Sequence, residues 1–264
     1  MYMDLVNSYK PDSEITLNNV THKMALVVPF RHCKDELKVF APYMRVFLNN
    51  QSIPHRIYVI NQLDDLRFNR AALINIGFLE SDSDCDYIAM HDVDLLPLNP
   101  KLNYSFPSAE GPHHVSAPGL HPKYHYQTFI GGILLMRREH YKQVNGMSNE
   151  FWGWGGEDDE FAQRILFNGL KVTHPQGIST GILHTFRHIH NDTTRPRDQE
   201  QYQKNIGRLP RLSSGIDDIQ YTLVSRNVTL INDTPVTFIN VHLSCDVERT
   251  PWCLQGKSGN VRVP

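Results

Sequence analysis

Residues 90–97, Met90-His91-Asp92-Val93-Asp94-Leu95-Leu96-Pro97, place two acids one residue apart between two apolar runs. The run before them, from Tyr87 to Met90, predicts a buried strand. Ionised acids beside a core are costly unless a cation meets them, and the ligands of open α/β sheets bind at the carboxyl ends of strands. The segment is therefore a candidate site for a divalent cation and the diphosphate it would hold, although a short motif of this kind is more often two exposed acids in a turn.

Alternating strands and helices are predicted around this segment. Apolar runs predict strands at residues 24–30, 56–61 and 87–92, and helical spacing predicts helices at 37–48 and 69–79. Pro42 is expected to kink the first helix or to delay its start. This order of elements predicts a parallel sheet with helices on its faces.

The second half of the chain is less regular. A Gly pair opens a predicted buried strand at 131–136, and four acids open a predicted helix at 157–168 that stops at Gly169. Residues 228–231 and 236–243 predict a late hairpin.

The composition is that of an ordinary globular protein. The 264 residues are 40% hydrophobic with a formal net charge of -2, which allows a full α/β core. No basic block stands out, which argues against a nucleic-acid partner. No apolar run is long enough to cross a bilayer, and no signal peptide opens the chain. We expect a tail or stem remnant at residues 1–20 and one domain at 21–264.

Two of the four cysteines, Cys245 and Cys253, lie close together near the C-terminus. They are expected either to form a local disulfide or to be two unrelated buried thiols. N-x-[S/T] sequons are weak signals singly, but together with the cysteine pair they favour a secretory-pathway lumen. They occur at Asn50, Asn103, Asn191, Asn227 and Asn232.

A second motif, Phe151-Trp152-Gly153-Trp154-Gly155-Gly156-Glu157-Asp158-Asp159-Glu160, joins a Trp-Gly loop to an acidic first helical turn. Acids there complement the helix dipole, which accounts for one or two of the four. Trp faces are platforms for sugar rings, and a neighbouring carboxylate can accept a proton from a sugar hydroxyl. The motif therefore favours chemistry on a sugar.

Two further patterns point to a metal and a phosphate. His188 and His190 fall on the same side of an extended segment, where they could share a cation such as Mn²⁺ or form an ordinary surface pair. Arg31 and Arg70 each lie near an aromatic residue at the mouth of the predicted sheet. Arginine can clamp a phosphate, and an aromatic ring can stack on a base.

The motifs at 29–31 (Pro-Phe-Arg), 68–71 (Phe-Asn-Arg-Ala), 92–94 and 152–159 occur in an order that resembles the β-1,4-galactosyltransferases, over about residues 22–253. Glu160 after the two aspartates, and the His188-Ile189-His190 spacing, resemble the branch of that family that acts on xylose in the proteoglycan linkage region.

The resemblance implies a GT-A fold, a Rossmann-like mixed sheet flanked by helices. It implies inverting transfer of galactose from UDP-galactose to O4 of a β-xylosyl-serine on proteoglycan core proteins, with Mn²⁺ as cofactor. A nucleotide-sugar half is expected at about 21–100, an acceptor half at about 101–264, and a lid at about 181–206 that reorders when donor and metal bind. The resemblance also implies a Golgi-lumen glycoprotein, with a membrane anchor that is absent from this chain.

The family's functional residues carry over to matching positions here. Mn²⁺ is expected on Asp94, His188 and His190, and Asp158 is expected to be the general base. Donor-binding residues would be Pro29, Phe30, Arg31, His32, Cys33, Phe68, Asn69, Arg70, Asp92, Val93, Asp94, Trp154, Glu157 and Arg197. Acceptor-binding residues would be Tyr124, Tyr126, Trp154, Gly156, Asp158 and Asp159.

Three alternatives stay open from the sequence. The first is a galactosyltransferase that acts on N-acetylglucosamine, because the choice of acceptor rests on family detail. The second is a metal-dependent hydrolase, although the chain has neither H-E-x-x-H nor a Cys-rich ligand set. The third is a sugar-binding module, which would have no use for the two Arg-aromatic pairs of a nucleotide site.

Overall fold

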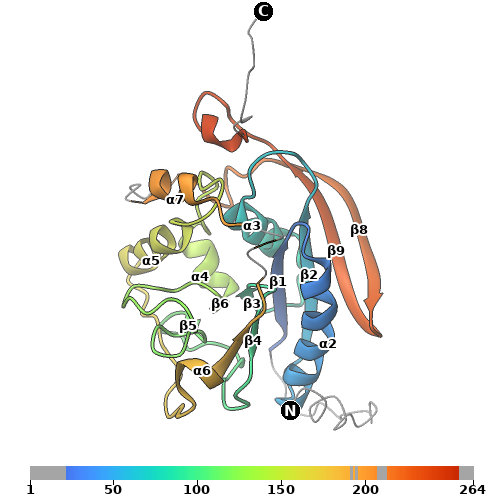
Figure 1. The fold of residues 1–264 in the computed structure, drawn as a ribbon, viewed down its shortest axis with the longest axis vertical. Helices are drawn as coiled ribbons and strands as arrows, with labels where there is room; N and C mark the ends of the chain where they lie inside the picture. The colour runs from blue at the N-terminus through green and yellow to red at the C-terminus, as the bar shows by residue number, and fades with distance from the viewer. Residues whose placement is uncertain (1–21, 191–192, 194–195, 207–212, 256–264) are drawn as a thin grey trace, which may run out of the picture.

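A seven-stranded mixed sheet forms the centre of this computed structural model, which describes residues 22–190, 193, 196–206 and 213–255 (Figure 1). The tail expected at 1–20 lies outside the described residues. The strand order is β5-β6-β3-β1-β2-β9-β8. The strands are β1 (Met24–Phe30), β2 (His55–Gln62), β3 (Tyr87–His91), β5 (His113–His114), β6 (Ile133–Arg137), β8 (Tyr221–Ile231) and β9 (Thr234–Leu243).

Only the middle of the sheet is parallel. β1 pairs in parallel with β2 and with β3, and β2 pairs in parallel with β9. β6 runs antiparallel to β3 and to β5, and β8 runs antiparallel to β9. A separate antiparallel pair joins β4 (Leu95–Pro97) to β7 (Phe186–His188). The sheet is therefore mixed, and the parallel core built from the first three predicted strands is confirmed.

Helices α2 (Lys34–Asn50) and α3 (Arg70–Glu80) cover opposite faces of this sheet (Figure 1). Alternate side chains of a strand point to opposite faces. Leu26 and Val28 of β1 pack in the cluster that contains α2, whereas Ala25 and Val27 pack in the cluster that contains α3. Because both faces are covered, every residue of β1 is buried. The other helices are α4 (Arg138–Gln143), α5 (Glu157–Phe167), α6 (Gly181–Thr185), α7 (Gln199–Asn205) and the 3₁₀ turn η1 (Pro251–Cys253).

Pro42 lies inside α2, which begins well before it at Lys34, so the predicted late start is wrong. A proline has no N–H to donate to the carbonyl one turn earlier. That carbonyl, of Lys38, instead accepts a hydrogen bond of 3.2 Å from Asn232 Nδ2 in the β8–β9 turn. The missing helical hydrogen bond is thus replaced by a contact from a distant hairpin.

The structure joins Cys245 to Cys253 in a disulfide, while Cys33 and Cys85 are buried and take part in no disulfide. Of the sequon asparagines, Asn191 lies outside the described residues and the other four are exposed. In the parts of the chain that the structure describes, no helix has the length and apolar character needed to cross a membrane.

Candidate active site

One cavity of about 610 Å³ collects side chains from all the sequence motifs. It opens where β1 and β3 end, between the loop before α3 and the first turn of α5. All predicted site residues line it except Phe30 and Asn69. The lining includes Pro29, Arg31, His32, Cys33, Phe68, Arg70, Asp92, Val93, Asp94, Tyr124, Tyr126, Trp154, Gly156, Glu157, Asp158, Asp159, His188, His190 and Arg197.

The side chains of Phe30 and Asn69 serve the scaffold behind the cavity. Phe30 is buried edge-on against Phe238, with ring centroids 6.0 Å apart. Asn69 is fully buried and is the N-cap of α3, where its side-chain oxygen accepts from Ala72 N. Asn69 Nδ2 also donates to Asn149 O at 2.8 Å. The Asn of the Phe-Asn-Arg motif therefore fixes the start of the helix that carries Arg70.

Arg70 is the central cation of the acidic wall. Its Nε donates to Asp92 Oδ1 at 2.7 Å and its Nη1 donates to Asp158 Oδ1 at 2.9 Å. Glu157 Oε1 lies 3.8 Å from the same Nη1. Burial lowers the pKa of Arg70, but the three carboxylates outweigh burial and the net shift is upward. Arg70 therefore stays charged and holds the carboxylates of two motifs that lie far apart in the sequence.

Burial lowers the pKa of an arginine but raises the pKa of a carboxyl group. It raises the pKa of Asp92, and the charge of Arg70 opposes this rise. The pKa of Glu157 is also raised, first by burial and then by the neighbouring charge of Asp158. A carboxyl that retains its proton can donate a hydrogen bond as well as accept one. Glu157 is thus suited to holding a hydroxyl, whereas Asp158 presents an oxygen beside Arg70.

The acidic turn of α5 divides between the cavity and the core. Glu157, Asp158 and Asp159 line the cavity. Burial raises the pKa of Asp159, against the effect of its hydrogen bond from Tyr126. Glu160 is buried and pairs with the fully buried Arg164, with Nε and Oε1 2.5 Å apart. The fourth acid of the motif is therefore structural.

Pairing of β4 with β7 brings Asp94 to the two histidines. Asp94 O accepts from Ile189 N at 2.8 Å. Asp94 Oδ2 then lies 2.9 Å from His190 Nδ1 and 4.0 Å from His188 Nε2. Burial lowers the pKa of His188 to about 4, so its imidazole is neutral, which is the form that binds metals.

This donor set of one carboxylate and two imidazoles fits a first-row cation such as Mn²⁺. Within the described ranges, no group of three or more His, Cys, Asp or Glu is already arranged to hold an ion. His190 instead contacts Asp94 directly. A cation bound here would have to replace that hydrogen bond.

Aromatic and cationic side chains form the remaining walls. The Arg31 guanidinium lies over the Phe68 ring at 5.2 Å. Arg197 lies over Trp154 at 5.3 Å, and Trp154 packs on Tyr202 with centroids 4.7 Å apart. Such surfaces suit a phosphate, a base and a sugar ring.

Several residues that line the cavity were not predicted from the sequence, among them Arg67, His121, Phe129, Asp198 and Tyr202. Arg67 adjoins the Phe-Asn-Arg motif and Asp198 follows Arg197, so closeness to a motif could have indicated both. Tyr202 carries no local signal, because only the folding of α7 onto the Trp-Gly loop brings it to the cavity.

Comparison with known proteins identifies the family. A model described as the N-terminal region of glycosyl transferase group 7 matches residues 3–107, and one described as the N-terminal domain of galactosyltransferase matches residues 111–189. β-1,4-Galactosyltransferase 7 of Drosophila melanogaster is 55% identical over 88% of this chain and 73% of its own length. This chain belongs to the β-1,4-galactosyltransferase family.

Further comparisons support a narrower placement within the β-1,4-galactosyltransferases. Xylosylprotein 4-beta-galactosyltransferase of Caenorhabditis elegans is 47% identical over 88% of this chain and 82% of its own length. The crystal structure of a mutant Drosophila β-1,4-galactosyltransferase 7 in complex with manganese, UDP-galactose and xylobiose superposes with a TM-score of 0.86. That match is 54% identical and covers 88% of this chain and 99% of the other. The expected GT-A glycosyltransferase fold is confirmed.

Proposed function

We propose that this β-1,4-galactosyltransferase transfers galactose from UDP-galactose to O4 of a β-xylose on proteoglycan core proteins, with inversion and with Mn²⁺ as cofactor. The observation that carries the proposal is the single cavity in which Arg70 links Asp92 of one motif to Asp158 of another. The relatives named for xylosylprotein transfer, and the related structure with manganese, UDP-galactose and xylobiose, support the same donor, metal and acceptor.

Asp94, His188 and His190 would hold the cation, and its charge, when bound, would neutralise the leaving diphosphate. Arg31 and Arg197 both line the cavity, where each could contact a phosphate oxygen. Phe68 offers a ring for the uracil. These side chains would orient the donor. The transfer would need no covalent intermediate with the enzyme.

Asp158 would remove the proton from xylose O4 as that oxygen attacks the anomeric carbon from the face opposite UDP. Arg70 holds Asp158 Oδ1, which leaves Oδ2, beside the bare backbone of Gly131, to accept the proton. A single displacement of this kind converts an α-linked donor into a β-linked product. Glu157, Asp159 and Tyr126, which line the cavity, would hold sugar hydroxyls, and Trp154 would support the ring.

The test is an assay with UDP-galactose, Mn²⁺ and a β-xyloside, compared with a β-N-acetylglucosaminide. We expect transfer to xylose to dominate. Asp158→Asn keeps the shape but cannot take the proton, so turnover should fall by at least about 10²-fold while calorimetry still shows UDP and xyloside binding. Near-normal turnover would remove Asp158 from this role. Galactose release without acceptor would favour a hydrolase, and sugar binding without UDP binding would favour a lectin.

We further propose residence in the Golgi lumen, which the Cys245–Cys253 disulfide supports because such bonds persist in oxidising compartments. Residues up to about 100 would mainly hold the nucleotide sugar and later residues the acceptor, with the metal site drawn from both. Residues of about 181–206 would act as a lid. Fractionation of cells that express the full-length protein tests the location, and hydrogen exchange with and without UDP and Mn²⁺ tests the lid.

A further inference from the structure

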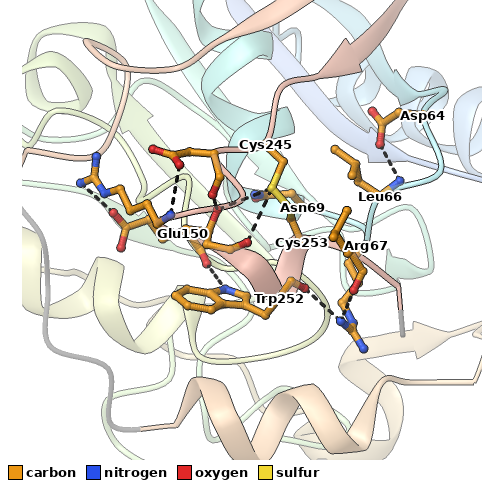
Figure 2. The surroundings of a disulfide bond; sticks show 12 residues. Asp64, Leu66, Arg67, Asn69, Glu150, Cys245, Trp252 and Cys253 are labelled. Atoms are coloured by element: carbon orange, nitrogen blue, oxygen red, sulfur yellow. Dashed lines mark hydrogen bonds and ion pairs between the residues drawn. A yellow bond between two sulfur atoms is a disulfide. The ribbon is translucent and has the colours of Figure 1, made fainter. Parts of the chain in front are cut away.

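The disulfide-closed loop, residues 245–253, contacts both loops that border the cavity (Figure 2). Trp252 Nε1 donates to Glu150 O at 2.8 Å, immediately before the Trp-Gly loop. On the other side, Arg67 N donates to Cys253 O at 2.7 Å. Arg67 Nη1 donates to Trp252 O at 3.0 Å and to Leu254 O at 2.5 Å. The disulfide loop is therefore attached to Arg67 by two hydrogen bonds, and a third joins Arg67 to Leu254, the residue that follows the loop.

The same guanidinium reaches α7 across the cavity edge. Arg67 Nε donates to Asp198 Oδ2 at 2.8 Å, and the Arg67 side chain is only 16% exposed. Asp198 is the N-cap of α7, where Oδ1 accepts from Gln201 N at 3.0 Å. Asp198 thus uses one oxygen to start α7 and the other to hold Arg67.

Helix α7 needs an external anchor because it has only seven residues. Isolated helices of that length are not stable in water. α7 nevertheless places Tyr202 against Trp154, and the segment before it places Arg197 over the same ring. Any movement at the start of α7 would therefore also displace Tyr202 and Arg197, which line the cavity.

We infer that Arg67 is a positioning residue for donor binding, which ties the start of α7 to the disulfide-closed loop 245–253. The inference rests on the proposed function in taking UDP-galactose as the donor. The disulfide limits the conformations open to its short loop, so the carbonyls that accept from Arg67 stay in place. The fixed Arg67 side chain holds Asp198 in place through their hydrogen bond. Asp198 in turn fixes the positions of Arg197 and Tyr202 against Trp154.

A double-mutant cycle at Arg67 and Asp198 tests the link. Arg67→Gln removes the charge, and Asp198→Asn removes the opposite charge but retains an oxygen that can cap α7. Each is expected to raise KM for UDP-galactose about tenfold, the size of one charge-assisted hydrogen bond, and to change kcat less. The double variant is expected to be no worse than Arg67→Gln alone, because Arg67→Gln already removes the ion pair that Asp198→Asn removes.

Two controls separate positioning from other roles. Glu200→Gln breaks an exposed ion pair with Lys204 on the same helix and should leave KM unchanged. Arg67→Lys keeps a charge but not the planar fork, so it should recover the donor KM only in part. Additive effects of Arg67→Gln and Asp198→Asn would mean that Arg67 contacts the donor on its own, and would overturn the inference.

The disulfide is tested with Cys245→Ser/Cys253→Ser. Should that variant not fold, Trp252→Phe is used, which removes the bond to Glu150 and part of the ring packing but keeps the backbone carbonyl that accepts from Arg67. Either should raise KM for the donor, and the double Cys variant should add nothing to Arg67→Gln. Hydrogen exchange of α7 without ligand gives a readout independent of activity and should increase in Arg67→Gln. Unchanged α7 exchange would overturn the inference, whereas wild-type protein that binds no UDP with Mn²⁺ would overturn the proposed function alone.

Discussion

Gly131 lies directly against the proposed base, and Gly131→Ala tests whether the position of Asp158 matters. A Cβ added at Gly131 would lie 2.7 Å from Phe129 Cε2 and 3.0 Å from Asp158 Cγ, and closer still to Asp158 Oδ2. Its backbone φ is not in the left-handed region, so alanine is allowed there and the effect is steric alone.

The backbone of Gly131 cannot easily move away. Its carbonyl accepts from His114 Nε2 at 2.9 Å, from Ser116 Oγ at 2.7 Å and from Ile133 N at 3.0 Å. Carbon atoms in contact stay about 3.5–4.0 Å apart, so the Asp158 carboxyl must shift by about 0.5–1 Å. That shift would lengthen its 2.9 Å hydrogen bond to Arg70.

A displacement of about 1 Å at a reacting group can lower the rate about 10²-fold. We therefore expect kcat for galactose transfer to a β-xyloside to fall about 10²-fold in Gly131→Ala, with UDP affinity in calorimetry unchanged. Gly119→Ala is the matched control, because a Cβ there would meet nothing within 4 Å. A folded Gly131→Ala enzyme with wild-type kcat would refute the argument, as would a further loss when Gly131→Ala is added to Asp158→Asn.

Three more outcomes are expected. Asp94→Asn and His190→Ala should raise the Mn²⁺ concentration for half-maximal activity at least about tenfold, and a titration like that of wild type would contradict the metal assignment. Burial and Asp158 raise the pKa of Glu157, so the native state binds more protons than the unfolded state and stability falls as pH rises through that raised pKa. Glu157→Gln should therefore flatten the decrease in Tm between pH 5 and pH 8, and an unaltered slope would speak against a raised pKa. Glu160→Gln takes the carboxylate from the fully buried Arg164 and should cost about 3–5 kcal/mol in urea unfolding, whereas a cost below about 1 kcal/mol would show that the pair is not a stabilising contact.

Local patterns predicted the elements that carry the chemistry. The acids after β3 and the first turn of α5 were identified because short apolar runs and charges mark them in the sequence. The pairing of β4 with β7 was not predicted, because three-residue strands have no periodicity of their own. The N-terminal half of β8 was also missed, since this edge strand is exposed on most of its length and lacks an apolar alternation.

Site residues were predicted from chemical type and from the family resemblance, and the structure brings all but Phe30 and Asn69 to the lining of one cavity. Arg70 and Asp158, a cation and an acid from two separate motifs, form a hydrogen-bonded ion pair in the cavity. Asn69 was predicted as a donor-binding residue inside the helix 69–79, whereas its side chain caps α3, because an N-cap uses the same side-chain oxygen as a ligand contact. Tyr202 depends on long-range packing that no local pattern contains.

The Phe-Asn-Arg motif that carries Arg70 is also joined to the segment of the Trp-Gly loop by two hydrogen bonds. Asn69 Nδ2 donates to Asn149 O, just before the Trp-Gly loop, and Gly153 N within that loop donates to Phe68 O at 2.8 Å. Arg70 is thus held on its own side by a capped helix and tied to the opposite loop at two points. A guanidinium on a freely moving loop would move with Asp92 or Asp158 and would not fix their separation. Because the segment that carries Arg70 is tied to the opposite loop, Arg70 would set the distance between the proposed diphosphate site and the proposed general base Asp158. For in-line transfer, that distance would have to match one sugar ring.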